Sequence, residues 1–354
     1  MSAEGFARGE SMRVIIVLVS VTILLLASQA AAAQTTCLPN GCGAPDSTIA
    51  AHRYPNVRSL PVDDALLGDR DYRPVTGPLA IYSAPDSPQP ESYGEGYTFV
   101  TAQEEHGQWV KIGDEQWVRA DSLGESYRPS RFAGALLPPD GNLPFTVAWT
   151  LTHLRGSKTP GGPEAADNRF LYRYSRVYIY ATVRVDGYDW YQIGQDQWVH
   201  QFKVAKILPA ARPAEVDTHK WISVDLYEQV AIAYEGEKPV FATLVSSGLE
   251  DWPTNEGLFH VYVRFTRTLM SGAYDQADFY YLQDVPWTMY YDDQIGLHGA
   301  YWHDGFGYRR SHGCVNLALT DAHWLFQWSE SEYDYRAGDY TGPAVYVYSS
   351  GEYD

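Results

Sequence analysis

One cysteine and two histidines near the carboxyl end of the chain are the residues best suited to chemistry. Cys314 stands in the run Ser311-His-Gly-Cys-Val-Asn316, and His298 lies sixteen residues before it. A thiol attacks a carbonyl group only as a thiolate, so it needs a base or a cation nearby. His312 is two residues away, and the intervening chain is long enough to bring His298 back from another strand. The spacing predicts a cysteine nucleophile for acyl transfer.

Neighbouring residues fit the same chemistry. Gly313 can form the tight turn that lifts the thiol out of a sheet. Arg309 and Arg310 add positive charge to a chain with a formal net charge of −18. We expect these arginines either to lower the pKa of the thiol or to hold a carboxylate of the substrate.

The elements that position this cluster are mostly strands. Apolar residues alternate with polar ones in five segments, which is the pattern of half-buried strands in a sheet or sandwich. These segments are 222–226, 230–234, 240–244, 259–265 and 345–347. The segment 321–329 instead has a helical pattern, and Thr320 is its expected cap. We therefore expect a β-rich domain with one short helix after Cys314.

Two upstream segments repeat each other. Trp109-Val-Lys-Ile-Gly-Asp-Glu-Gln-Trp-Val and Trp190-Tyr-Gln-Ile-Gly-Gln-Asp-Gln-Trp-Val are offset by 81 residues. Each copy reads as strand, turn and strand, and resembles a bacterial SH3-like small barrel. We place the two barrels at 75–128 and 147–208, with a flexible insertion at 155–168 and linkers at 129–146 and 209–217. The repeats are either wall-binding modules or small β cores filled by their tryptophans.

The amino-terminal residues indicate export. Residues 14–33 are mostly apolar and end in four alanines. This pattern indicates that residues 1–33 are a secretory signal peptide or, if they are not cleaved, a membrane anchor. A linker at 34–74 follows, in which Cys37 and Cys42 are close enough in sequence to form a small disulfide. Cys314 then has no partner, and an odd thiol in an exported protein is either a packing residue or a reactive group. The acidic net charge argues against nucleic acid as a partner.

Together these residues carry a family resemblance. The run Ser311-His-Gly-Cys-Val-Asn316, with His298 upstream, resembles the L,D-transpeptidase catalytic (YkuD) domain. The resemblance extends over 218–349, including Trp221-Ile-Ser-Val-Asp-Leu, Val245-Ser-Ser-Gly and Glu256-Gly-Leu-Phe. It implies a mainly β chain of two SH3-like barrels followed by a β-sandwich-type catalytic domain.

The resemblance also implies roles for individual residues. Cys314 would attack the peptide bond between a diamino acid and the terminal D-Ala of a peptidoglycan tetrapeptide stem, with His298 as the base and His312 in support. The expected oxyanion and supporting groups are Gly313, Tyr281, Gly299 and Ser311. The expected substrate contacts are Arg310, Asn316, Trp302 and Tyr301. Carbapenems would inhibit, a second stem or a wall-attached protein would be the acceptor, and no metal or cofactor is implied.

Three alternatives remain open at this point. Water in place of an amine acceptor would make the protein an L,D-carboxypeptidase. His298, His303, His312 and Cys314 are zinc-ligand types, although their spacing matches no common zinc motif. A binding protein with an inactive site is the third alternative. The loop between His298 and Ser311 is aromatic, and its rings form either a substrate lid or ordinary packing.

Overall fold

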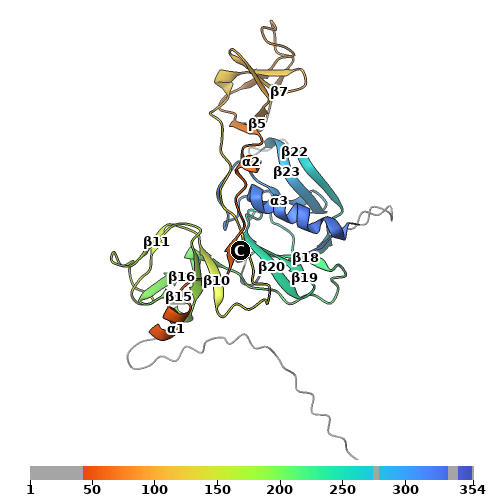
Figure 1. Ribbon diagram of the computed structural model, residues 1–354. Coiled ribbons are helices and arrows are strands. Elements are labelled where there is room, and N and C mark those ends of the chain that lie inside the picture. Colours follow the sequence, from red (N-terminus) through yellow and green to blue (C-terminus); the bar gives the residue numbers. More distant parts are fainter. Residues whose placement is uncertain (1–42, 274–278, 334–341, 353–354) are drawn as a thin grey trace, which may run out of the picture. The chain divides into compact units, whose positions relative to one another are not determined.

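The computed structural model describes residues 43–273, 279–333 and 342–352 (Figure 1). This part of the chain is mainly β, with few helices. The apolar segment 14–33 and the pair Cys37 and Cys42 lie outside the described residues. Within the described residues, no helix has the length and apolarity needed to cross a membrane.

Two sheets form the carboxyl-terminal part of the structure. The first has seven strands in the order β1-β9-β20-β19-β18-β26-β21. The second has the order β2-β5-β23-β24-β25, with β22 pairing with β23. The bounds of the first are β1 (Arg58–Ser59), β9 (Ala135–Leu136), β18 (Lys220–Asp225), β19 (Val230–Glu235), β20 (Lys238–Leu244), β21 (Gly257–His260) and β26 (Ala344–Tyr348). Those of the second are β2 (Asp71–Pro74), β5 (Tyr97–Ala102), β22 (Val263–Gly272), β23 (Tyr280–Asp292), β24 (Ile295–Gly299) and β25 (Val315–Leu317).

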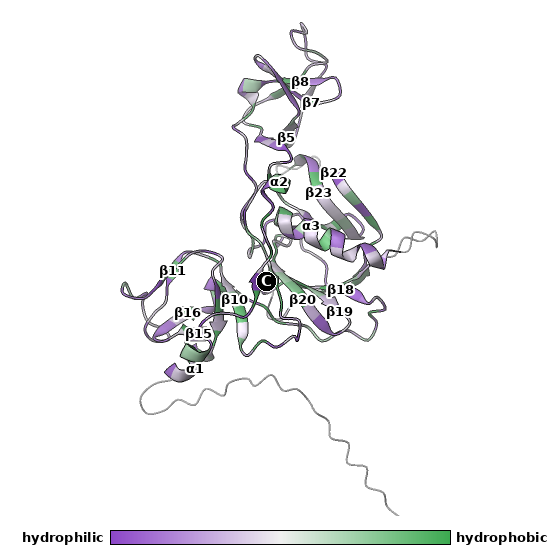
Figure 2. Ribbon diagram, viewed as in Figure 1, coloured by the Kyte–Doolittle hydropathy of each residue, from purple (hydrophilic) through white to green (hydrophobic). Residues whose placement is uncertain are grey.

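A shared apolar core joins these two sheets. Ile222 and Val224 of β18 lie in one buried cluster with Met289 of β23 and Leu297 of β24. The helix α3 (Leu319–Trp328) adds Leu325 to this cluster, and Figure 2 shows hydrophobic and hydrophilic residues mixed along it. The period-two pattern therefore located these strands, but β18 and β19 are buried on both faces and not half-buried as predicted.

Two local predictions were wrong. The alternating segment 259–265 is not one strand, because the chain leaves β21 and enters β22, which belongs to the other sheet. The helix begins at Leu319, so Thr320 lies inside its first turn instead of capping it. Ala318 stands at the cap position and makes no side-chain capping bond.

The upstream residues form five smaller sets of strands and short helices. The sheets are β3-β4, β6-β7-β8, β13-β10-β17, β11-β12 and β14-β15-β16. In these sheets, the strands that belong to the first repeat are β3 (Leu79–Ile81), β4 (Ser92–Gly94), β6 (Glu104–His106), β7 (Trp109–Gly113) and β8 (Gln116–Arg119). Those of the second are β10 (Thr146–Thr150), β11 (Leu154–Arg155), β12 (Phe170–Leu171), β13 (Arg176–Ile179), β14 (Ala181–Val185), β15 (Tyr188–Gly194), β16 (Gln197–His200) and β17 (Val204–Lys206). The upstream helices are α1 (Asp46–Ala51), α2 (Asp64–Leu67), η1 (Ala120–Ser122) and η2 (Gln201–Lys203), whereas η3 (Ser329–Glu332) follows α3.

The two sequence repeats have the same local structure. In each, a hairpin (β7-β8 or β15-β16) has a register shift before its turn and ends in a 3-10 helix. Glu115 and Asp196, 81 residues apart, both have a φ of 50° in these turns. Trp109 and Trp198 are buried, whereas Trp117 and Trp190 keep partial exposure. The SH3-like nature of the two units stays a prediction.

Segments expected to be linkers add strands to the two large sheets. β9, within 129–146, pairs with β20, and β1 pairs with β9. From the first repeat, β5 pairs in parallel with β23. The insertion 155–168 was expected to be flexible, but hydrogen bonds hold its end in place. The Asn168 amide donates to the carbonyls of Gly156 and Asp196, both at 2.8 Å.

Candidate active site

Pairing of two adjacent strands brings the cysteine and one histidine together. β24 and β25 are parallel, with Leu297 opposite Val315 and His298 opposite Asn316. Continuing this register by one residue puts Gly296 opposite Cys314. Alternate residues of a strand share a face, so Cys314 and His298 approach the same side of the sheet.

Cys314 occupies a partly exposed position beside the β23-β24 turn. Its thiol lies 3.6 Å from the carbonyl oxygen of Gln294, to which the S–H donates. Burial of the sulfur raises the pKa of the thiol to about 11, and a hydrogen bond from the backbone of Gly296 opposes this only in part. The resting thiol is therefore protonated. The expectation that Arg309 and Arg310 lower its pKa is not met, because burial dominates.

His298 is buried, with 2% of its surface exposed. Its Nδ1 lies 3.3 Å from the carbonyl oxygen of Gly299. A carbonyl can only accept, so Nδ1 carries the hydrogen and Nε2 keeps its lone pair. Burial lowers the pKa of His298 to about 4, so its imidazole is neutral at physiological pH. The ring of Trp302 packs 5.7 Å away from that of His298, centre to centre.

The loop that presents Cys314 is held by side chains of the chain itself. Ser311 Oγ accepts from the backbone N–H of Gly313 at 3.1 Å and donates to the carbonyl of Cys314. Gly313 has a φ of +109°, and a Cβ there would lie 3.3 Å from Ile295. This supports the predicted turn. The hydrogen bond to Ser311 Oγ also occupies the Gly313 N–H, which we expected to be an oxyanion donor.

A second segment, 246–254, supports this loop and was not expected as part of the site. Thr254 Oγ1 donates to the carbonyl of Gly313 at 2.7 Å and accepts from the N–H of Gly248 at 2.9 Å. The N–H groups of Arg310 and Ser311 both donate to the carbonyl of Ser247. The resemblance at Val245-Ser-Ser-Gly was the only sequence signal for this contact.

His312 and the tyrosines of β23 surround the thiol loop. The His312 ring lies between those of Trp252 and Tyr280, at 5.2 and 4.9 Å. Tyr290 is the tyrosine coupled to the thiol, because burial and then the charge of Cys314 raise the pKa of Tyr290 to about 12. Tyr281 pairs with Ser271 and with residue 97 on the neighbouring strands.

Two predicted substrate contacts are buried. Tyr301 has no exposed surface, stacks on Tyr72 at 3.6 Å between ring centres, and donates its hydroxyl to the carbonyl of Gln283. Asn316 is 3% exposed, lies opposite His298 in the β24-β25 register, and has its amide 2.9 Å from the ring of His303. Both residues have little or no exposed surface, and their roles as substrate contacts stay predictions. Trp302 is half-buried and Arg310 is exposed, so their roles stay predictions.

His303 is a buried neighbour of the site that the predicted contacts did not include. Its Nδ1 accepts from the N–H of Gly305 at 3.0 Å, so its proton is on Nε2. Asn316 Nδ2 lies 2.9 Å from that nitrogen, and because an Nε2–H can only donate, the amide must be turned over to present its oxygen there. Burial, followed by the charge of Arg310, lowers the pKa of His303 to about 3. His303 and Asn316 therefore form a neutral pair beneath the loop.

The zinc hypothesis has no geometric support in the described part of the chain. Within it, no group of three or more His, Cys, Asp or Glu side chains is placed to hold a metal ion. Cys314, His298 and His303 instead have backbone or amide partners.

Comparisons with known proteins agree with this geometry. Residues 219–347 match the family model described as the L,D-transpeptidase catalytic domain, YkuD. This segment is a YkuD domain. The putative L,D-transpeptidase YciB of Bacillus subtilis is 29% identical over 122 residues, covering 31% of this chain and 60% of the relative. The chain thus spans less than two thirds of that relative.

Solved structures of similar sequence are also L,D-transpeptidases. The catalytic domain from E. faecium is 26% identical, covering 38% of this chain and 100% of that domain, with a TM-score of 0.32. The same domain acylated by ertapenem is 26% identical, covering 37% and 98%, with a TM-score of 0.31. L,D-transpeptidase 1 of Mycobacterium tuberculosis is 18% identical, covering 37% and 59%, with a TM-score of 0.29. The YkuD assignment depends on the family model and the curated relative.

Proposed function

We propose that this protein is an exported peptidoglycan L,D-transpeptidase that uses Cys314 as its nucleophile. The observation on which the proposal depends is the pairing of β24 with β25, inside the segment that matches the YkuD domain. In this register a free thiol and a neutral imidazole with an unprotonated Nε2 lie on the same face of one sheet. The apolar segment 14–33 supports export, to the cell wall or the periplasm, with or without a membrane anchor.

In this mechanism the thiol and the imidazole begin uncharged. As sulfur attacks the carbonyl carbon between the diamino acid and D-Ala, its proton passes to Nε2 of His298. The tetrahedral intermediate then expels D-Ala, whose amine takes that proton, and leaves a thioester on Cys314. An amine of a second stem, or of a wall-attached protein, attacks the thioester, forms the new peptide bond and restores the thiol.

The loop geometry assigns the supporting roles. The imidazolium that forms in the transition state is stabilised by its Nδ1–H bond to the Gly299 carbonyl. The Cys314 N–H is the remaining backbone candidate for the oxyanion, since the Gly313 N–H is bonded to Ser311. His312 is placed by its aromatic neighbours to support the loop or to contact the stem.

Two experiments test this proposal. A carbapenem carries a strained amide that acylates a nucleophilic thiol, so we expect a covalent adduct on Cys314 by mass spectrometry. Cys314→Ala should give none, and His298→Ala should form it about 100-fold or more slowly. With tetrapeptide stems, cross-linked dimers support transpeptidation, whereas tripeptides alone would show a carboxypeptidase. Absence of both products and of the adduct would show an inactive binding protein.

A further inference from the structure

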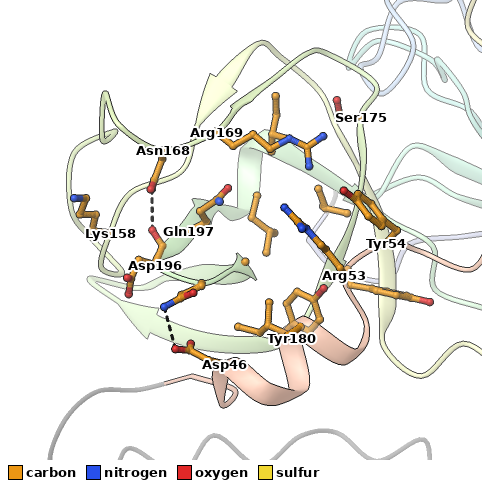
Figure 3. A pocket seen from close by; sticks show the side chains of 18 of the residues that line it. Asp46, Arg53, Tyr54, Lys158, Asn168, Arg169, Ser175, Tyr180, Asp196 and Gln197 are labelled. Atoms are coloured by element: carbon orange, nitrogen blue, oxygen red, sulfur yellow. Dashed lines mark hydrogen bonds between the residues drawn. The ribbon is translucent and has the colours of Figure 1, made fainter.

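A second candidate site lies away from the catalytic thiol. A cavity of about 660 Å³ opens in the second repeat (Figure 3). Its walls come from α1 and the residues after it, from the insertion before β12, from β13 and from the β15-β16 turn. Small-molecule sites in proteins usually measure about 300–1,000 Å³. The cavity is therefore large enough for an organic ligand.

The amino-terminal segment is firmly attached where it forms one wall. The N–H of Ala44 donates to Gln192 Oε1 at 2.6 Å, and the N–H of Asn56 donates to the hydroxyl of Tyr178 at 2.9 Å. The hydroxyl of Tyr180 donates to the carbonyl of His52 at 2.5 Å. These contacts fix both ends of the wall, so the cavity is a built feature of the fold.

Three arginines line this cavity without carboxylate partners. Within residues 43–273, 279–333 and 342–352, Arg53, Arg169 and Arg176 make no ion pair. Arg53 lies over the ring of Tyr54 at 5.6 Å, and Arg176 donates to the carbonyl of Val57 at 3.4 Å. Burial of Arg176 lowers the pKa of its guanidinium.

The acidic residues that line the cavity either have a partner already or lie at the end away from Arg53 and Arg169. Asp167 pairs with Lys158, and Asp46 accepts from the Gln195 amide at 2.9 Å. Figure 3 shows Arg53 and Arg169 extending into one end of the cavity, while Asp196 and Lys158 lie at the other end. One end is therefore cationic even though the whole lining carries both signs.

These cations are not required by the repeat. The position 81 residues before Arg176 is Glu95, which has the opposite charge. The arginines are therefore a property of the second unit and of the amino-terminal segment that packs on it.

We propose that this cavity binds an organic oxyanion, whose carboxylate or phosphate groups are held by Arg53 and Arg169. Guanidinium groups match such oxyanions through paired N–H donors, and an anion between two arginines removes their mutual repulsion. Arg176 adds a third positive charge at the wall. The site is independent of Cys314 chemistry, and it would hold an acidic segment of a polymer or a free acid of similar size.

Isothermal titration of the full-length chain tests this site. The probes are trigalacturonate for carboxylates, glycerol phosphate for phosphate, and maltotriose as a neutral sugar, in low salt at pH 7. We expect one or both anions to bind with a dissociation constant below 1 mM, with binding weakened at 200 mM salt. The anion with the lower dissociation constant shows whether the natural ligand carries carboxylate or phosphate groups. Equal binding of maltotriose, or no binding of either anion below 10 mM, would overturn the proposal.

Matched variants separate the site from general charge effects. Arg53→Gln and Arg169→Gln should each weaken anion binding about tenfold or more, because each removes charge-assisted hydrogen bonds. Arg184→Gln removes the same charge from an exposed position of β14 outside the cavity and should change binding less than twofold. Arg53→Lys should recover part of the loss. All four variants should keep the wild-type rate of Cys314 acylation, and equal effects of all Gln variants on binding would refute the assignment.

Discussion

The protonation state of Cys314 gives a prediction that distinguishes a neutral thiol from a preformed thiolate-imidazolium pair. Its pKa is raised from an ordinary 9.0 to about 11 by burial. Two pH units correspond to about a 100-fold smaller thiolate fraction at neutral pH. Because only the thiolate reacts with iodoacetamide, alkylation should be about 100-fold slower than for an ordinary thiol and should rise nearly tenfold per pH unit from 6 to 9.

The imidazole of His298 should not affect how the alkylation rate of Cys314 depends on pH. The pKa of His298 is lowered to about 4 by burial, so His298 stays neutral throughout that range. His298→Gln should therefore leave the slope of alkylation against pH unchanged, while slowing carbapenem acylation, in which a base must take the proton. The contrast separates a base used during reaction from a preformed ion pair.

The assay must resolve the three cysteines. Alkylation is followed by peptide mass spectrometry at Cys314, because Cys37 and Cys42 also react if they are reduced. Cys314→Ala gives the background for this peptide. A plateau in the rate between pH 6 and 8 would indicate a thiolate paired with imidazolium and would refute the neutral resting state.

Further predictions concern the groups that support the site. Thr254→Val removes the hydrogen bonds to the Gly313 carbonyl and the Gly248 N–H, so it should lower the free energy of unfolding by about 1–3 kcal/mol and slow acylation of the thiol. Unchanged values of both would contradict the supporting role. Gly248→Ala puts a Cβ 2.1 Å from the carbonyl oxygen of Trp252 and should destabilise the fold by about 2 kcal/mol or more, seen as a lower Tm. Burial raises the pKa of Asp321 from 3.8 to about 7, so the folded state favours its protonated form and loses stability as pH rises from 4 through 7, by up to about 1.4 kcal/mol per unit. Asp321→Asn should flatten denaturation free energy against pH over that window, and a curve parallel to the wild type would be evidence against this.

The sequence predicted the strands better than the site. Ile222 and Val224 alternate with polar residues, so periodicity alone located β18, but it did not reveal that both faces of this strand are buried. Thr254 lies 59 residues from Gly313 and has no local pattern, so only the fold could reveal their hydrogen bond. The cysteine and histidine motif was visible because both residues are near the ends of adjacent strands.

Protonation states were beyond the sequence for a physical reason. Residue types alone favour a thiolate at Cys314, since arginines and histidines are close in the chain. Burial depends on how the two sheets pack, and it outweighs those charges by raising the pKa of the thiol to about 11. The arginine charge acts instead on His303, whose pKa is lowered further by Arg310.

The aromatic loop shows why packing and binding cannot be separated by composition. Tyr301 follows His298 closely and was assigned to substrate, yet it stacks on Tyr72 beside the first repeat. Phe306 of the same loop contacts Phe132 from the segment between the repeats, and the Tyr174 hydroxyl of the second repeat donates to the Asp304 carbonyl at 2.9 Å. All three upstream regions thus hold the loop that leads from the candidate base to the nucleophile. Residues upstream of β18 consequently contribute to the geometry of the candidate site.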